Sequence, residues 1–414
     1  MSSEWIETTV GEFCQFHYGK NLPQPNRVKG NVPVISSAGI IDNHNAAFVN
    51  KAGVVIGRKG SVGKVTYSPD PFWPIDTAFF VEDQPQKRDI RFVYYLLQTL
   101  GFEEMNSDSA VPGLNRDNAH AIQIKIPFLS EQKKIADFLA NLDDRITLLR
   151  ETNQTLEAIA QAIFKSWFVD FDPVRAKMEG RAPEGMDEET AALFPDAFEE
   201  SELGLMPKGW YCCSFSETVE VIGGGTPKTS VAEYWGGNIP WFSVVDAPNL
   251  SDVFVLETEK NITQTGLNNS STKLLPIGTT IISARGTVGR LALTGRAMAM
   301  NQSCYGLRGK AGDEFFTYFN TARLVEQLKQ RAHGSVFDTI TQKTFSGISV
   351  VYPTKKEILA FDKVVQPLLE RIKTNLLHIS TLTALRDTLL PRLISGQLSL
   401  HDVDLPEFSS TELV

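Results

Sequence analysis

The sequence predicts an α+β protein with two similar domains, each followed by a long helix, and with the two helices packed against one another. Three observations predict this fold. The chain has 414 residues, of which 42% are apolar and 21% charged, as is typical of a globular protein with roughly two to four domains. It also contains an internal repeat of about half its length, and a heptad pattern ends each copy.

The internal repeat relates the two halves at a shift of about 205 residues near their starts, which grows to 226 farther along. The matching segments are Trp5 with Trp210, Val32-Pro33 with Ile239-Pro240, Lys59–Lys64 with Arg285–Arg290, Pro127 with Pro353, and Asp144–Ile146 with Glu370–Ile372. The last three pairs share one register, which chance similarity would not keep over so long a span. A period near 200 residues is too long for a solenoid, so it indicates two copies of one domain-plus-helix unit.

The first part of each copy combines short strands with short helices. Turn-forming residues separate runs that have the length and composition of strands. The predicted strands are Val32–Ser36, Gly53–Gly57, Phe79–Glu82 and Ile122–Ile126 in the first copy, and Thr279–Ser283 and Ile348–Tyr352 in the second. The predicted helices are Ile90–Leu100 and Phe315–Gln330. This mixture indicates an α+β domain with an irregular sheet.

The second part of each copy is a long helix with an apolar stripe. The spacing of the stripe alternates between three and four residues, which is the heptad pattern of a coiled coil. In the first copy the stripe is Ile135, Leu139, Leu142, Ile146, Leu149, Asn153, Leu156, Ala160, Ile163 and Trp167. In the second copy it is Phe361, Val365, Leu368, Ile372, Asn375, Ile379, Leu382, Arg386, Leu389 and Leu393. Neither helix can bury its stripe alone, so we expect the two to pack together.

Polar residues and prolines modify this expectation. Asn153 and Asn375 each place an amide in the stripe, where a single polar residue helps to fix the register. Pro367 lacks the amide hydrogen that a helix interior needs, so it predicts a kink or a break in the second helix. Pro391 should end or bend that helix again.

The net charge of −9 is concentrated in one segment. Residues 169–204 contain three positive and eleven negative side chains, whereas residues 1–130 have a net charge of −1 and residues 205–355 of +3. The net charge of the whole chain therefore neither excludes nor supports a nucleic-acid partner. Local basic patches are the feature that would indicate one. We interpret residues 169–204 as a mostly exposed connector with one short helix near Asp187–Leu193. The alternative is an acidic docking surface for a basic partner.

Domain boundaries follow from these patterns. They are a first domain at 1–130, a first long helix at 131–168, the acidic connector at 169–204, a second domain at 205–355, a second long helix at 356–396 and a tail at 397–414. The four cysteines form no C-x-x-C pair, which fits a reducing cytoplasm without a disulfide framework or a structural zinc site. We expect neither a signal peptide nor a membrane helix.

A glycine-rich basic turn occurs once in each copy, as KGSVGK at Lys59–Lys64 and RGTVGR at Arg285–Arg290. It does not match a P-loop, because the spacing from Gly57 is wrong and a strand-like run follows Lys64. Glycine allows close approach of the backbone, and Lys, Arg, Ser and Thr bind phosphate oxygens or base edges. We therefore predict DNA contact here, and a hairpin that merely needs two glycines is the alternative.

Two further pairs of segments suit DNA contact. Tyr18–Pro23 pairs loosely with Gly223–Thr229, and each has a lysine near glycine, although ordinary turns explain both equally well. Arg116 aligns with Gln342, so that the first could reach guanine and the second adenine, while a structural role is the alternative for each. The predicted DNA-binding residues are Lys20, Arg58, Lys59, Ser61, Lys64, Arg116, Lys228, Thr229, Arg285, Thr287, Arg290 and Gln342.

The sequence contains no recognisable catalytic motif. His17, His44, His120 and His333 have no partners at the spacing of a metal site or a catalytic triad, and we expect them to be structural or exposed. Hydrolase, metalloprotease and methyltransferase motifs are absent. We therefore expect this chain to have no catalytic residues, no metal and no cofactor of its own.

Three longer motifs stand at the ends of the two helices and at the start of the second copy. They are Ile163–Val174 (IFKSWFVDFDPV), Leu389–Leu398 (LLPRLISGQL) and Gly204–Trp210 (GLMPKGW). With these motifs the chain resembles, over nearly its whole length, the specificity subunit of a type I restriction–modification system. The resemblance implies two target-recognition domains, each recognising one half of a split DNA sequence. It also implies that two antiparallel helices of a coiled coil separate them, within a pseudo-two-fold internal repeat.

The resemblance also implies partners. These are double-stranded DNA and two adenine-N6 methyltransferase subunits that use S-adenosylmethionine. It leaves open two restriction subunits that use ATP and Mg to translocate DNA. The chain itself would be a non-catalytic recognition subunit of the cytoplasm with no membrane partner. Two alternatives remain: a fused methyltransferase or nuclease, against which the missing motifs argue, and a scaffold whose two heads bind proteins instead of DNA.

Overall fold

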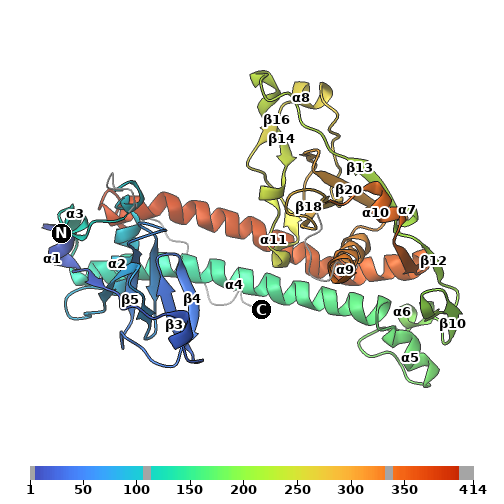
Figure 1. Ribbon diagram of the computed structural model, residues 1–414, viewed down its shortest axis with the longest axis horizontal. Coiled ribbons are helices and arrows are strands. Elements are labelled where there is room, and N and C mark those ends of the chain that lie inside the picture. The colour runs from blue at the N-terminus through green and yellow to red at the C-terminus, as the bar shows by residue number, and fades with distance from the viewer. Residues whose placement is uncertain (1–4, 106–112, 332–338, 401–414) are drawn as a thin grey trace. The chain divides into compact units, whose positions relative to one another are not determined.

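The computed structural model describes residues 5–105, 113–331 and 339–400 (Figure 1). The chain forms two compact units, one of Met1–Ile146 with Ser380–Val414 and the other of Thr147–Ile379. We call them unit 1 and unit 2 and describe each by itself. Each consists of a mixed head and of adjoining stretches of two long helices, α4 (Leu129–Phe168) and α11 (Lys355–Ile394).

The head of unit 1, called head 1, contains a closing pair of strands and two small sheets. The antiparallel strands β1 and β9 pair Ile6 with Ile126. The sheets have the strand orders β2-β8-β5-β6 and β4-β3-β7. The bounds are β1 Ile6–Thr9, α1 Val10–Phe13, β2 His17–Tyr18, β3 Val32–Ser36, β4 Gly39–His44, β5 Gly53–Gly57, β6 Val65–Ser68, β7 Trp73–Pro74, β8 Ala78–Glu82, α2 Ile90–Gln98, α3 Arg116–His120 and β9 Gln123–Ile126. The core includes Val54 of β5 and Phe92 of α2, both fully buried.

The head of unit 2, called head 2, has the same plan. Its closing strands β12 and β21 pair Tyr211 with Tyr352, and its sheets have the orders β13-β20-β17-β18-β15 and β16-β14-β19. The bounds are β12 Tyr211–Ser214, α7 Phe215–Thr218, β13 Val219–Gly223, β14 Trp235–Phe242, β15 Phe254–Val255, β16 Asn261–Ile262, α8 Gln264–Asn268, β17 Thr280–Ser283, β18 Leu291–Thr294, β19 Ala299–Met300, β20 Cys304–Gly309, α9 Phe315–Arg331, α10 Gln342–Ser346 and β21 Ser349–Tyr352. Its core includes Ile282 of β17 and Phe316 of α9.

The structure confirms the predicted duplication. The helices α4 and α11 both have 40 residues, and their first residues, Leu129 and Lys355, are 226 positions apart. The same shift relates β6 to β18, β7 to β19, α3 to α10 and β9 to β21. The six predicted strands are all present with ends within one residue of the prediction, and both predicted short helices form. The two heads are therefore copies of one fold.

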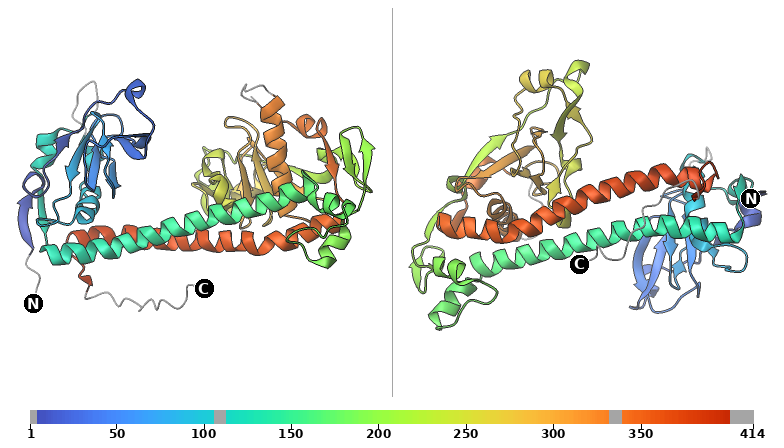
Figure 2. Two further views of the ribbon diagram at one scale, coloured as in Figure 1. Left: turned by 90° about the horizontal axis from the view of Figure 1, so that it is seen from below. Right: turned by 180° about the vertical axis from the view of Figure 1, so that it is seen from behind.

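The long helices lie side by side and antiparallel in unit 2 (Figures 1 and 2). Asn375 Nδ2 donates to Asn153 Oδ1 at 2.8 Å, and both side chains are fully buried. Phe164 lies beyond Asn153 along α4 and contacts Phe361, which precedes Asn375 along α11, so the helices run in opposite directions. Of the other predicted stripe residues, Leu139, Ile146, Leu149 and Ile372 are buried and Leu142, Leu368 and Leu382 half-buried.

Replacing Asn375 by alanine is expected to lower the free energy of unfolding of unit 2 by about 1–3 kcal/mol, because the amide of Asn153 would remain buried without its partner. Asn153 Nδ2 and Asn375 Oδ1 already lack partners. Replacing both residues by leucine should therefore recover most of the loss or exceed the original stability. Urea unfolding of the two variants tests this, and a double variant as unstable as the single one would contradict it.

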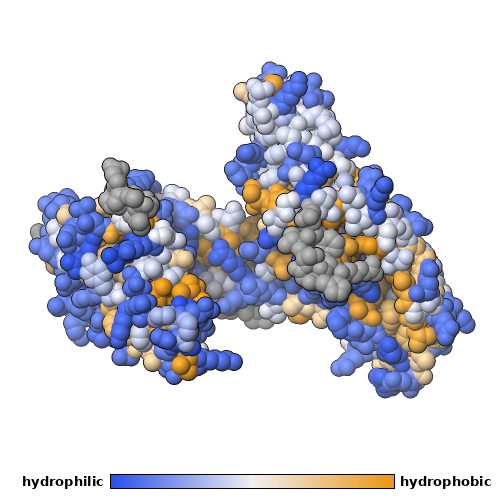
Figure 3. All heavy atoms as spheres, viewed as in Figure 1, coloured by the Kyte–Doolittle hydropathy of each residue, from blue (hydrophilic) through white to orange (hydrophobic). Residues whose placement is uncertain are grey.

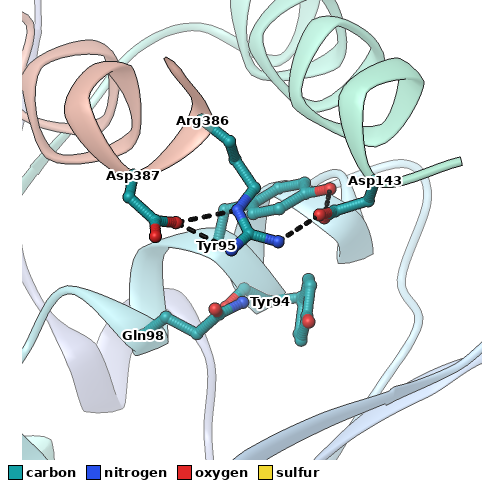
Figure 4. A network of polar contacts seen from close by, with 6 residues as sticks. All are labelled: Tyr94, Tyr95, Gln98, Asp143, Arg386 and Asp387. Atoms are coloured by element: carbon teal, nitrogen blue, oxygen red, sulfur yellow. Dashed lines mark hydrogen bonds and ion pairs between the residues drawn. The ribbon is translucent and has the colours of Figure 1, made fainter. Parts of the chain in front are cut away.

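A polar network joins head 1 to both long helices within unit 1 (Figure 4). Asp143 on α4 accepts one hydrogen bond from Tyr95 Oη of α2 at 2.7 Å and another from Arg386 Nη1 of α11 at 2.6 Å. Arg386 also pairs with Asp387 at 2.7 Å. Burial raises the pKa of Tyr95, so its hydroxyl stays protonated and donates. The network explains how Arg386, a charged residue, occupies a position of the apolar stripe.

Of the kink or break predicted at Pro367, the break does not occur. The helix α11 continues as one element from Lys355 to Ile394. Pro367 and Lys363, whose carbonyl loses its helical donor, both lie on the exposed face of the helix, where water can satisfy that carbonyl. Pro391 stands in the last turn, and the helix ends three residues later, in agreement with the prediction for that position.

The acidic connector is largely exposed, as predicted, but it forms more structure than the one predicted helix and packs onto unit 2. It forms α5 (Asp172–Met178), α6 (Glu188–Leu193), β10 (Phe198–Ser201) and β11 (Gly204–Pro207). The helix expected near 187–193 is confirmed as α6. Val174 and Phe194 of the connector are buried in the core of unit 2. The high charge of the segment hid these few apolar residues, which fix its position.

The connector also contributes apolar surface. Figure 3 shows hydrophobic residues over this end of unit 2, and the exposed side chains there include Met178, Leu203 and Leu205. A cavity of about 220 Å³ lies between the connector, α9 and β21, and Arg323 is among its lining residues. Arg323 Nη1 donates to the carbonyl of Phe168 at 3.1 Å, which ties α9 to the end of α4.

Candidate nucleic-acid interface

The basic turn of head 1 is a hairpin between β5 and β6. The amide of Gly63 donates to the carbonyl of Gly57 at 2.9 Å. Gly60 and Gly63 have φ angles of 81° and 80°, which residues with a side chain rarely adopt. A Cβ atom on Gly63 would also lie 2.6 Å from the backbone nitrogen of Glu103. The turn itself therefore requires both glycines.

The basic turn of head 2 has the same conformation. Gly286 and Gly289 have φ angles of 75° and 80°, and the amide of Gly289 donates to Ser283 at 2.9 Å. A Cβ atom on Gly289 would lie 2.8 Å from a methyl group of Val325. The need for a hairpin thus explains the glycines of both turns, but it leaves the conserved pattern of cations and hydroxyls between the two copies unexplained.

The first cation of each turn has an exposed side chain. Lys59 forms a β-bridge with Gly113, and Arg285 forms the equivalent bridge with Thr339. Neither side chain makes an ion pair with a residue that the structure describes. The hydroxyl residues Ser61 and Thr287 are exposed at equivalent positions of the two turns. These cations are free to meet an external anion.

The last cation of each turn holds a neighbouring loop instead. Lys64 Nζ donates to the carbonyl of Ala38, just after β3. Arg290 Nη2 donates to the carbonyls of Ala247 and Pro248, at 3.1 and 2.9 Å, in the corresponding loop after β14. Both side chains remain partly exposed, but these bonds give them a structural role that the sequence pattern did not indicate.

Arg116 and Gln342 occupy the same place in the two heads, as the alignment of the repeats predicts. They are the first residues of α3 and α10. In head 1 the amide of Leu114 donates to the backbone carbonyl of Arg58 at 2.9 Å. In head 2 the amide of Ile340 donates to the backbone carbonyl of Ala284, also at 2.9 Å. These bonds tie each short helix to its turn.

Lys20 lies apart from the turn and close to the second sheet of head 1. Its Nζ is 5.5 Å from the ring centre of Phe48 and 5.7 Å from that of Trp73. A Cβ atom on Gly19 would lie 2.1 Å from the carbonyl oxygen of Ile75, so this glycine is needed for chain packing.

The Gly223–Thr229 segment of head 2 is similar. A Cβ atom on Gly224 would lie 1.9 Å from the carbonyl oxygen of Asn301, which is the equivalent of the Gly19 contact in head 1. Lys228 and Thr229 follow this glycine and have exposed side chains. The carbonyl of Lys228 accepts from Trp235 Nε1 at 3.3 Å. Gly19 and Gly224 thus serve packing in the two heads, and Lys20 and Lys228 remain at the surface.

The sequence analysis missed Tyr18 as a site residue. This tyrosine is about half exposed at the end of β2, with the Arg58 guanidinium 4.9 Å and the Arg116 guanidinium 5.2 Å from its ring centre. The three residues are far apart in sequence, so the only available signal was an aromatic residue beside the Gly19-Lys20 pair. The structure thus gathers Tyr18, Arg58, Lys59 and Arg116 at one edge of head 1.

No arrangement typical of catalysis appears among the described residues. They contain no group of three or more His, Cys, Asp and Glu side chains that could hold a metal ion. His44 Nδ1 and His120 Nε2 accept hydrogen bonds from the amides of Val28 and Phe16, in keeping with the structural role expected for them, while His333 lies outside the described residues. None of the described helices has the length and apolar character needed to cross a membrane.

Comparison with known proteins identifies the family. Residues 2–158 and 207–377 match the model of the type I restriction modification DNA specificity domain, so that each half of the chain carries one such domain. The chain belongs to the type I restriction–modification specificity subunits. It is therefore a DNA-recognition subunit of a host-defence system, and subunits of this family are non-catalytic.

Named relatives agree with this assignment. The chain is 31% identical over 355 residues to the type I restriction enzyme HindI specificity subunit of Haemophilus influenzae, a match that covers 74% of this chain and 77% of the relative. It is 26% identical over 203 residues to the EcoR124I/EcoR124II specificity subunit of Escherichia coli, covering 48% and 41%. The crystal structure of an S subunit from M. genitalium has the same fold, with a TM-score of 0.61 at 16% identity and coverage of 95% and 96%.

The motifs by which the chain resembles this family serve packing. Phe164 and Phe168, from the motif at the end of α4, are buried in the core of unit 2 against Phe361 of α11. Leu393 and Ile394, from the motif at the end of α11, are buried in the core of unit 1. Motifs of this kind identify the scaffold, whereas the side chains at the edges of the heads distinguish one head from the other.

Proposed function

We propose that the chain recognises a bipartite, asymmetric DNA site, in which head 1 binds one half-site and head 2 binds the other. A half-site is one of the two specified parts of the split sequence. One observation supports this proposal most strongly. In each head a β-bridge joins the basic turn to the segment before a short helix, α3 or α10, but the side chains exposed beside the turn differ between the heads. A shared scaffold with different contacting groups is suited to two different sequences.

Charge and chemistry at these edges support DNA as the ligand. Lys59 and Arg285 are exposed cations without an ion pair among the described residues, and such groups gain most from meeting phosphates. Arg116 and Gln342 stand at the equivalent helix starts. The donors of arginine suit guanine, and the donor and acceptor of the glutamine amide suit adenine. Lys20, Lys228 and Thr229 are exposed and complete the proposed contact residues.

We further infer that the long helices set the number of unspecified base pairs between the half-sites. Both helices have 40 residues, and a buried amide pair fixes their register in unit 2. Helices of fixed length and register suit the role of a spacer, because recognition at two half-sites depends on their separation along the DNA.

The chain is proposed to direct partner subunits to this site. Membership of the family supports two adenine methyltransferase subunits as partners, with S-adenosylmethionine bound to them, and two restriction subunits that use ATP and Mg where the system also cuts DNA. This chain would supply the sequence recognition and no step of the chemistry. Co-expression with the methyltransferase subunit, followed by mapping of methylated adenines, gives the sequence of the site.

Replacing Lys59 by alanine is expected to weaken binding of the first half-site by about 1–3 kcal/mol if Lys59 contacts a base, and to lower the salt dependence if it contacts a phosphate. Arg285→Ala should do the same for the second half-site. Lys125→Ala is the control, because Lys125 is an exposed lysine on β9 that pairs with Glu7 at 3.0 Å. Binding by the Lys59 and Arg285 variants that equals the control at every salt concentration would assign both turns a purely structural role.

A further inference from the structure

One cluster in head 1 has no counterpart among the residues of head 2 that the structure describes. The guanidinium groups of Arg58 and Arg116 lie 4.9 and 5.2 Å from the ring centre of Tyr18, which is 49% exposed. Arg58 is also 5.7 Å from the ring centre of Phe79, and its amide donates to the carbonyl of Thr77 at 2.9 Å. Two cations from distant parts of the chain are thus held together on one exposed aromatic ring.

We propose that Tyr18, Arg58 and Arg116 form a guanine-recognition centre, so that the half-site of head 1 contains guanine at the positions these arginines face. The inference rests on the proposed function, since it assumes that this edge of head 1 meets DNA. It adds the identity of the bases and the role of Tyr18, which positions the two arginines.

The chemistry of the cluster favours guanine. Two guanidinium groups repel one another unless acceptors lie nearby. The carboxylate of Asp117, 3.4 Å from Arg116 Nε, is largely exposed. Arginine has only donors, and the O6 and N7 atoms of guanine in the major groove accept two of them in the geometry of one guanidinium. The ring of Tyr18 restricts both side chains before binding, which reduces the entropy that recognition costs.

Strand register identifies the matching positions in head 2. Tyr18 pairs with Phe79 in head 1, and Gly223 pairs with Tyr305, 226 residues after Phe79, in head 2. Gly223 therefore stands where head 1 has Tyr18.

The other two positions follow from hydrogen bonds and helix starts. The carbonyl of Arg58 accepts from the amide of Leu114, and in head 2 the carbonyl of Ala284 accepts from the amide of Ile340. Arg116 opens α3, and Gln342 opens α10. The three members of the cluster are thus replaced together, by Gly, Ala and Gln, on an otherwise repeated scaffold. A group of side chains that changes as a set while its scaffold stays is what a specificity determinant requires.

The first arm of the test removes the centre. The full chain is co-expressed with its methyltransferase subunit, and methylated adenines are mapped for Arg58→Lys, Arg116→Lys, Tyr18→Leu and Tyr18→Phe. Lysine keeps the charge but lacks the planar fork of the guanidinium group, so each lysine variant should lose about 5- to 150-fold discrimination at one guanine of one half-site. Tyr18→Leu should relax the same positions, Tyr18→Phe should keep the original sequence, and the other half-site should not change.

The second arm builds the centre in head 2 with Gly223→Tyr, Ala284→Arg and Gln342→Arg combined. A Cβ atom on Gly223 would meet no atom within 4 Å, so the new tyrosine has space at its base, but Ala284 is buried, so folding of the variant is checked first. The second half-site should then acquire a guanine requirement. Should the triple variant fail to fold, the lysine variants of the first arm still decide.

The outcomes separate this inference from the proposed function. If the lysine variants leave the sequence of both half-sites unchanged, or weaken all sequences equally through phosphate contacts only, the guanine centre is wrong. If Lys59→Ala still weakens one half-site in that case, the proposed function stands without it. If no variant in either head affects DNA binding, both proposals fail.

Discussion

Replacing Phe361 by alanine is expected to lower the free energy of unfolding of unit 2 by about 3–5 kcal/mol, the largest stability effect we expect from a single substitution in this chain. Phe361 on α11 is fully buried. Its ring lies 5.4 to 6.4 Å, centre to centre, from those of five aromatic residues, Phe164, Trp167, Phe168, Phe316 and Phe319. These residues belong to α4 and α9, so the substitution leaves a cavity where both long helices meet head 2.

Urea unfolding followed by tryptophan fluorescence measures this effect, because Trp167 and Trp210 lie in the same core. Leu359→Ala is the matched control, since Leu359 is an apolar residue of the same helix that is 39% exposed, and it should change the stability by less than about 1 kcal/mol. Equal losses for the two variants would show that the aromatic cluster does not hold the helices to head 2.

Removing one heptad from each long helix is expected to shorten the unspecified part of the DNA site by about three base pairs. Seven residues of helix span about 10.5 Å, and one base pair spans about 3.4 Å. Because Asn153 pairs with Asn375, the matched deletions are the seven residues that end at Asn153 in α4 and the seven that begin at Asn375 in α11. A whole heptad keeps the remaining apolar stripe in register.

Methylation mapping of the co-expressed complex measures the result. The two half-site sequences should be unchanged while the gap between them shrinks, and duplication of the same heptads should lengthen the gap by the same amount. An unaltered gap in a variant that still methylates DNA would reject the role of the helices as a spacer.

The scaffold could be predicted from the sequence because two kinds of pattern supported each other. The KGSVGK and RGTVGR turns and the heptad stripes recur at one shift, and the structure repeats the helices and strands at that same shift of 226 residues. The predictions were incomplete where one property of a residue or segment was weighed without its packing. Pro367 predicted a kink or a break, and the helix does not break there because its exposed position lets it continue. The charge of the connector predicted exposure, but Val174 and Phe194 anchor it in the core.

The candidate site was less accessible from the sequence. The turns were found because their glycines and cations are contiguous. Lys64 and Arg290 donate to backbone carbonyls of neighbouring loops that are 26 or more residues away in sequence. No local pattern indicates these hydrogen bonds. Tyr18 could not be linked to Arg58 and Arg116, because only the folding of head 1 brings these three segments together.

Exchange of one head for the other tests most directly whether each head recognises its own half-site. Ile6–Ile126 and Tyr211–Tyr352 are bounded by equivalent strand pairs, so replacing the second segment by the first keeps both junctions with the long helices. Methylated adenines mapped with this variant should reveal a site in which the half-site of head 1 occurs twice. Methylation of the original asymmetric site, or a second half-site unrelated to the first, would contradict the account.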